Sequence, residues 1–396
     1  MKILALFAVL TLGAAILQAD EKSAVHDSPE RRHAFELYDH FKMVEAMPLL
    51  QKLATENPND IAVWERLGMA MLNYASSLDD PALAKLARAK ARAIFLKAKE
   101  MGDTSNLVEL FAEIPEDGGD VTFSPRAEVN KAMQQAEADF AKGDLDKAIE
   151  GYMIALSLDP KLYDAALFMG DVYFKQDKQN LAGEWFDRAI KINPDRETAY
   201  RYWGDSLVMA KKVKEARTKF IEAVIAEPYA RRSWVGITQW AEKIGEKLHH
   251  TPLHDPANTE VKGGNLKMNL DTMNKEGDPV AAAWLAYGVE RALWQKEKFR
   301  KEFPGEPQYR FTSAEESDSL HTLAAVLAEQ KSKGAISDTP PALTELMRVD
   351  EAGLLMPYVF LFRATESIAK DYPAYRARHR DTIRRYLNEY VVPRLE

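Results

Sequence analysis

Residues 163–196 read YDAALFMGDVYFKQDKQNLAGEWFDRAIKINPDR, and they set the pattern for the middle of the chain. The segments on either side, 129–162 and 197–230, carry similar residues at the same offsets. Three prolines mark the period of 34 residues: Pro160, Pro194 and Pro228. A fixed period of this length indicates a stack of similar structural units and not one globular core.

Each unit is predicted to be a pair of short helices. Ala182, Phe186 and Ala189 lie at i, i+4 and i+7, which is one face of a helix, and Pro194 ends that helix. Small residues suit the places where two helix backbones cross closely, and larger apolar side chains fill the remaining space. The recurring structural positions are Ala136, Ala148, Tyr152, Ala155 and Pro160; Gly170, Tyr173, Ala182, Phe186, Ala189 and Pro194; and Gly204, Ala216, Phe220, Ala223 and Pro228.

This set of residues resembles the tetratricopeptide repeat (TPR) family, and the middle unit matches at every position named above. The first unit departs from the pattern, with Ala136 in place of glycine and Asp139 in place of an aromatic residue. The last unit has Leu207 where the family usually has an aromatic residue. The resemblance implies an all-α superhelix of antiparallel helix pairs, which usually binds protein partners along its concave face.

Weaker units flank this core. Residues 20–114 are predicted to be a degenerate TPR-like helical region, in which Ala91, Phe95 and Ala98 follow the opening helix about eleven residues late. We expect a loop over 76–84 to account for that delay, and a linker at 115–128. Residues 129–245 are then the TPR core with a capping helix that begins near Trp234.

The period disappears after the core. Residues 246–280 are predicted to be a loop junction with one small β-hairpin, because Gly263-Gly264 separates short alternating segments. Residues 281–396 are expected to form a non-repeat α-helical C-terminal domain. There, Ser313 and Glu316 form a capping-box signature, and 351–368 is predicted to be a single helix.

The ends and the composition indicate an exported protein. Residues 1–19 have the charge, apolar stretch and small final residue of a secretory signal peptide. We therefore expect a bacterial periplasmic or extracellular location, with no transmembrane segment after signal cleavage. The formal net charge of −8 argues against nucleic-acid binding. The absence of cysteine, of a Gly-rich phosphate loop and of a nucleophile elbow gives no indication of a cofactor or a catalytic centre.

The predicted partner-binding site is the concave groove. One acidic residue follows the small residue of each first helix and repeats every 34 residues: Glu137, Asp171 and Asp205. The groove residues predicted to accompany them are Phe140, Leu167, Phe174 and Arg201. An acidic groove with an apolar floor suits a basic or polar extended peptide or a partner helix. The alternative is that these polar residues serve only solubility.

Other candidate sites lie beyond the core. His249, His250 and His254, next to Asp255, are weak candidate metal ligands, and a plain loop is the simpler interpretation. The aromatic residues around Trp284 to Phe311 suit a domain core better than a ligand pocket. A basic face at Arg376, Arg380 and Arg384 is expected to pair with acidic residues of the same chain.

The sequence thus favours a non-enzymatic, exported TPR scaffold or adaptor that binds a protein or peptide partner. The alternative is a hydrolase or metal-binding protein with its site in residues 248–396 and the repeats as an adaptor. A third possibility is self-association of the superhelix, and the sequence leaves the oligomeric state open.

Overall fold

The computed structural model describes residues 28–40, 42–78, 80–103, 108, 111–112, 114–119, 122–141, 143–254, 260–262, 265–267 and 279–395. The predicted signal peptide lies outside these ranges. Apart from one two-stranded hairpin, the regular structure of the described part is helical, as expected. The chain divides into two compact units, Met1–Ala165 and Ala166–Glu396. Within the described ranges, no helix combines the length and apolar character needed to cross a membrane.

The first unit opens with four described helices: α2 (Pro29–Asp39), α3 (Met43–Glu56), α4 (Ile61–Ser76) and α5 (Pro81–Glu100). Helix α4 pairs with α5 because Gly68 leaves room for the ring of Phe95, which is fully buried. The predicted loop over 76–84 was too long. Helix α5 begins at Pro81, where the Asp80 carboxylate accepts a hydrogen bond from the Ala82 amide at 2.8 Å.

Two more helices of the first unit are α7 (Ala127–Ala141) and α8 (Leu145–Leu158). Their crossing explains how this repeat carries Ala136 in place of glycine. The second helix supplies the small residue instead, since a methyl group placed on Gly151 would lie 2.7 Å from Cβ of Ala136. Within the predicted linker, residues 115–119 are held against α5, because Arg88 Nε donates to the Gly118 carbonyl at 2.8 Å.

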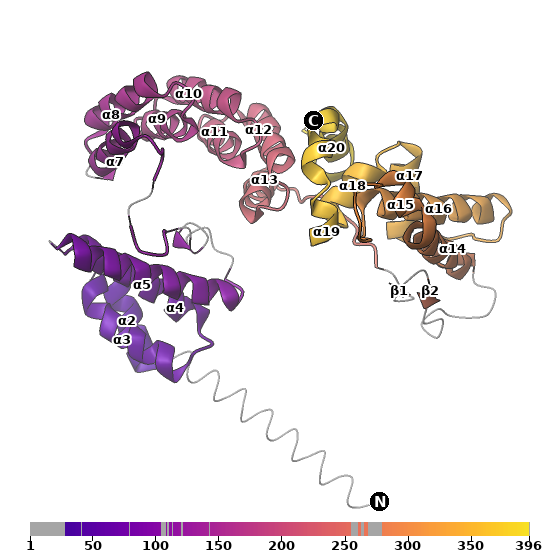
Figure 1. The fold of residues 1–396 in the computed structure, drawn as a ribbon, viewed down its shortest axis with the longest axis horizontal. Helices are drawn as coiled ribbons and strands as arrows, with labels where there is room; N and C mark the ends of the chain where they lie inside the picture. The colour runs from indigo at the N-terminus through magenta and orange to yellow at the C-terminus, as the bar shows by residue number, and fades with distance from the viewer. Residues whose placement is uncertain are drawn as a thin grey trace, which may run out of the picture. The chain divides into compact units, whose positions relative to one another are not determined.

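The second unit continues the repeats with α9 (Tyr163–Lys175), α10 (Gln179–Ile192), α11 (Glu197–Met209), α12 (Val213–Ala226) and α13 (Arg231–Lys243) (Figure 1). The prolines Pro160, Pro194 and Pro228 each follow the end of a second helix, as predicted. The aromatic residue of each second helix fills the space above the glycine of its first helix. A methyl group on Gly204 would lie 2.6 Å from Cε1 of Phe220, and one on Gly170 would overlap Phe186.

The turn inside each helix pair recurs with the same period. Gly143, Asp177, Lys211 and Gly245 all have positive φ, between 59° and 82°. In the middle repeat the Lys178 amide donates to the Tyr173 carbonyl at 2.9 Å, and the equivalent bond joins Lys212 to Leu207. This pattern is the Schellman motif that ends a helix. Because Gly245 has the same conformation, the chain begins a fourth unit with α13 and its turn. Among the described residues, no second helix completes that unit.

The C-terminal domain consists of α14 (Pro279–Leu293), a π-helical turn η2 (Trp294–Lys298), α15 (Phe299–Glu302), α16 (Ser313–Ser332), α17 (Pro341–Glu351), α18 (Leu355–Phe362), α19 (Glu366–Ala369), α20 (Tyr372–Tyr386) and a π-helical turn η3 (Leu387–Val391). The hairpin joins β1 (Glu260–Lys262) to β2 (Asn265–Lys267), with Val261 opposite Leu266. The hairpin prediction is confirmed, and its Gly263-Gly264 turn lies outside the described residues. The single helix predicted over 351–368 is instead divided into α18 and α19.

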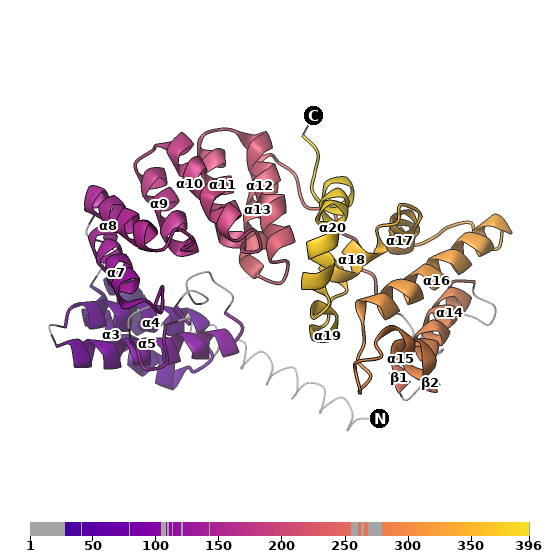
Figure 2. The same cartoon turned by 45° about the horizontal axis from the view of Figure 1, so that its top comes forward.

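This domain shares one hydrophobic core with the last repeats. Phe220, Trp240 and Trp284 belong to the same buried cluster as Ile383 and Leu387 of the C-terminal elements. Figures 1 and 2 both show α20 beside α12 and α13. In a longer stack, a further helix pair would cover the last repeats. Here the C-terminal domain covers them instead and so acts as the cap that a terminal repeat needs.

Ion pairs hold α20 against α12, as the sequence predicted for its basic face. Glu222 on α12 accepts from Arg380 at 3.0 Å and from Arg384 at 2.5 Å. Arg376 lies 2.8 Å from Asp195, and the Tyr372 hydroxyl donates to the Ile225 carbonyl at 2.6 Å. That last bond satisfies a carbonyl at the end of α12 that has no partner within its own helix.

The glycine packing leads to a stability prediction. Gly170→Ala should lower the free energy of unfolding by about 1–3 kcal/mol, because the added methyl group overlaps the buried Phe186 ring. Chemical denaturation measures this change. Gly305→Ala is the control, since nothing lies within 4 Å of the added methyl group and little change is expected. Equal stability of the two variants would contradict the repeat packing described above.

Candidate functional site

The candidate site is formed by one face of the first helices α9 and α11. Leu167, Asp171 and Phe174 lie at i, i+4 and i+7 of α9, and Arg201 with Asp205 occupies the equivalent positions of α11. We call these five residues the first-helix face. Helix periodicity places the members of each set on one side of their helix. Leu167 is buried at 3% exposure and so offers almost no surface to a partner, contrary to the prediction, whereas Phe174 is half-buried.

Asp171 is a half-buried carboxylate on this face. Burial raises the pKa of Asp171, and the nearby Lys175 lowers it by a smaller amount. Its carboxylate has no hydrogen bond or ion pair with other described residues. A carboxylate that loses water without gaining a partner costs free energy, so the fold alone does not account for its presence.

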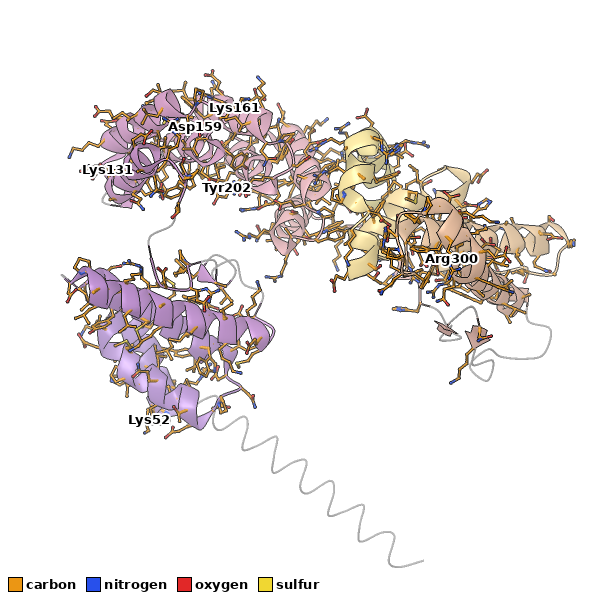
Figure 3. The ribbon with its side chains drawn as sticks, in the orientation of Figure 1. Lys52, Lys131, Asp159, Lys161, Tyr202 and Arg300 are labelled. Atoms are coloured by element: carbon orange, nitrogen blue, oxygen red, sulfur yellow. The ribbon has the colours of Figure 1, made fainter. Side chains whose placement is uncertain are left out.

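Asp205 is the equivalent carboxylate on α11, and burial changes its pKa more than that of Asp171. Burial raises the pKa of Asp205 to about 6, even though Arg201 favours its charged form. Arg201 is already paired with Glu197, whose carboxylate accepts from Nε at 2.9 Å. The Arg201 guanidinium also lies 4.8 Å from the ring centre of Tyr202, which is labelled in Figure 3. Within the described chain, Asp205 thus has a charged neighbour but no hydrogen-bonded partner.

The remaining predicted groove residues belong to the first unit. Glu137 accepts a hydrogen bond from the hydroxyl of Tyr152, the aromatic residue of its own repeat. It is therefore used by the repeat itself, in contrast to Asp171 and Asp205. Phe140 is half-buried on α7. The role of these residues in binding a partner stays a prediction.

The candidate metal ligands are placed differently from one another. The backbone amide of His249 donates to the Val391 carbonyl at 2.8 Å. The ring of His250 stacks on Phe362 with ring centres 3.8 Å apart, and burial lowers its pKa. His254 is exposed, and Asp255 lies outside the described residues. In the part of the chain that the structure describes, no three metal-ligating side chains converge.

The C-terminal domain contains two buried carboxylates, Glu315 and Glu316, and the capping box predicted for Ser313 and Glu316 is wrong. The cap of α16 is Thr312, which accepts from the Glu315 amide at 3.1 Å, and not Ser313. Glu316 does not cap the helix, because it accepts from Tyr287 at 2.7 Å and from Arg363 at 2.8 Å. These partners lie far away in the sequence, so no local signal identified them.

Glu315 has equivalent partners. Its carboxylate accepts from Tyr309 at 2.8 Å and from Arg291 at 3.3 Å, and burial raises its pKa to about 7. Each of the two glutamates is therefore held by one tyrosine and one arginine. This arrangement joins α14, α16 and the segment after α18, and it is a structural network.

Several solved structures are similar to this chain, although no protein-family model matches it. The Sgt2 TPR domain from Aspergillus fumigatus is 21% identical, over 35% of this chain and 97% of that one, with a TM-score of 0.29. The first TPR of Spaghetti (RPAP3), bound to the HSP90 peptide SRMEEVD, is 17% identical over 32% of this chain and 100% of that one, with a TM-score of 0.29. YrrB, a TPR protein with an unusual peptide-binding site, is 13% identical over 56% of this chain and 96% of that one, with a TM-score of 0.27.

The raised pKa of Asp205 predicts a gain in stability on its removal. A carboxyl group with a raised pKa in the folded state makes folding less favourable as the pH rises from about 4 to about 6, because the folded state keeps its proton longer. Asp205→Asn should therefore be more stable than the wild type by about 1–2 kcal/mol at pH 7.5. The difference should disappear near pH 4. Thermal unfolding at both pH values measures it, and a less stable variant at pH 7.5 would show that Asp205 supports the fold.

Proposed function

We propose that this chain of tetratricopeptide repeats is an exported, non-enzymatic scaffold that binds a basic, extended segment of a protein partner against its first-helix face. The observation that carries the proposal is the pair of half-buried carboxylates at Asp171 and Asp205, neither of which is hydrogen-bonded to another described residue. A cationic side chain of a partner would supply the missing partner in a place already shielded from water. Charge-assisted hydrogen bonds are strongest in such an environment.

The chain's own acidic and basic residues support this assignment by contrast. Asp195 and Glu222 are paired with arginines of α20, and Glu197 is paired with Arg201. These carboxylates hold the structure together. Asp171 and Asp205 take no part in those ion pairs, so their charges are available to a ligand.

The charge of this face also sets the kind of ligand. The HSP90 peptide bound by the Spaghetti domain, SRMEEVD, is acidic near its end. Asp171 and Asp205 would repel such a segment, because like charges brought together at an interface disfavour association. We therefore expect a segment with lysine or arginine side chains, spaced to reach successive repeats, and an apolar residue against Phe174.

Peptide binding tests this proposal directly. A labelled SRMKKVK peptide should bind at pH 7.5 and low salt, and SRMEEVD should not. Asp171→Asn with Asp205→Asn should weaken binding about 10-fold or more, since each change removes a half-buried charge. Binding by the wild type should also weaken below pH 6, where Asp205 becomes protonated. Fluorescence anisotropy measures all of these.

The matched control also removes two negative charges, but from second helices instead of first helices. Glu184→Gln with Glu215→Gln removes two exposed carboxylates of α10 and α12, and it should leave peptide affinity within about 2-fold. An equal loss in both double variants would show that net charge, and not the first-helix face, attracts the peptide. Tighter binding of SRMEEVD than of SRMKKVK would contradict the proposal outright.

Export has its own test. The composition of residues 1–19 supports cleavage by a signal peptidase, with Asp20 as the first mature residue. Intact-mass measurement on protein purified from a bacterial envelope fraction should give a chain that begins at Asp20. A chain that retains Met1 and is recovered from the cell interior would contradict export without affecting peptide binding.

A further inference from the structure

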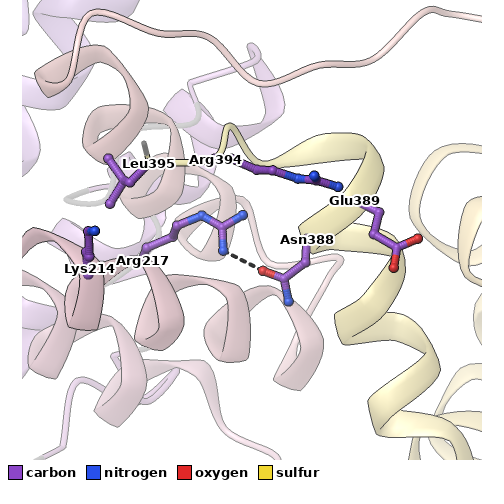
Figure 4. A pocket seen from close by; sticks show the side chains of 6 residues that line it. All are labelled: Lys214, Arg217, Asn388, Glu389, Arg394 and Leu395. Atoms are coloured by element: carbon purple, nitrogen blue, oxygen red, sulfur yellow. Dashed lines mark hydrogen bonds between the residues drawn. The ribbon is translucent and has the colours of Figure 1, made fainter.

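A second site lies apart from the first-helix face, where the start of α12 meets the C-terminal residues. A hollow of about 480 Å³ is present there (Figure 4). Its lining residues are Lys214, Arg217, Asn388, Glu389, Arg394 and Leu395. This volume falls in the range of small-molecule sites. None of these residues belongs to the first-helix face.

Arg217 occupies the wall of the hollow without an anionic partner. Its guanidinium donates to the Pro393 carbonyl at 2.9 Å, to the Val392 carbonyl at 3.0 Å and to the side-chain amide of Asn388. All three acceptors are neutral, so the positive charge is hydrogen-bonded but not neutralised. Burial lowers the pKa of Arg217, and the neighbouring Arg394 lowers it further.

Two more cations line the same hollow. Lys214 lies one turn before Arg217 on α12, and Arg394 extends beside Arg217 from the C-terminal residues (Figure 4). In the described chain, neither the Lys214 ammonium group nor the Arg394 guanidinium makes a hydrogen bond or ion pair. Among the described lining residues the acidic one is Glu389, and Arg385 already donates to it at 3.1 Å. Three cations thus face the hollow with little compensation.

The position of these cations is unfavourable for the chain alone. Lys214 lies in the first turn of α12, where the helix dipole repels positive charge, and the exposed Glu215 of the same turn offsets part of that repulsion. Arg394 adds electrostatic repulsion toward Arg217. A bound anion in the hollow would relieve the repulsion among the three lining cations, since it would interact favourably with each of them.

We infer that this hollow binds a phosphate monoester group. A single carboxylate would neutralise one of the three cations, whereas a phosphate monoester carries nearly two negative charges at neutral pH and three acceptor oxygens. The guanidinium plane of Arg394 suits two of those oxygens, and the Lys214 ammonium group suits the third. The remaining volume, next to Leu395, would hold the group that carries the phosphate.

Titration calorimetry with inorganic phosphate at pH 8 and constant ionic strength tests this site in the full chain. Wild-type protein should bind saturably, and sodium chloride should not replace phosphate. Lys214→Gln with Arg394→Gln should weaken binding about 10-fold or more, because it removes two charge-assisted contacts. Arg217 is left unchanged, since it holds the C-terminal residues to α12.

The matched control is Lys331→Gln with Arg378→Gln, which removes two exposed cations elsewhere in the same domain. Its phosphate affinity should stay within about 2-fold of the wild type. Vesicles of phosphatidylcholine with and without phosphatidic acid distinguish the source of the group. If the protein binds vesicles with phosphatidic acid and inorganic phosphate displaces it from them, the ligand is a lipid headgroup. If the protein binds inorganic phosphate but not the vesicles, the ligand is soluble. Absence of both, or equal loss in the two double variants, would overturn the inference.

Discussion

The structure depends on the contact between an aromatic ring in each second helix and a small residue in the first helix it crosses. Phe186 above Gly170 and Phe220 above Gly204 allow the backbones to approach closely, and the buried alanines fill what remains. Phe220 serves two neighbours, since Gly236 of α13 also lies against it. Phe186 likewise packs edge-on against Tyr202 of the next first helix, so these two rings hold their own pair and its neighbour together, and the spacing must recur.

The same contact shows why some of the fold was predictable. A period of 34 residues repeats the crossing geometry, so a few small and aromatic residues predicted one helix pair in each of three consecutive units, which α7 to α12 form. The exceptions were also local in origin. Ala136 could replace glycine because Gly151 supplies the small residue from the other helix, and Lys211 adopts positive φ although it is not glycine. A single repeat considered alone would have revealed neither substitution.

Long-range partners were beyond such reasoning. Glu222 and Arg380 are 158 residues apart, and Glu316 with Arg363 are 47 apart, so spacing alone could not pair them. The candidate site was likewise predictable only in part. The period located Asp171 and Asp205 on equivalent positions, but only the folded chain shows that burial raises the pKa of each while Glu137 is bound by Tyr152. The basic hollow had no sequence signal, because its residues come from two distant segments.

The unfinished fourth unit affects which end of the array loses its structure first. Its turn at Gly245 is in place, but the chain then leads into a domain whose core is continuous with that of α12 and α13. Repeat arrays ordinarily lose their end units first, because a terminal unit has only one neighbour. Here that end shares a buried core with the C-terminal domain, so it should fray less than a free terminal unit would.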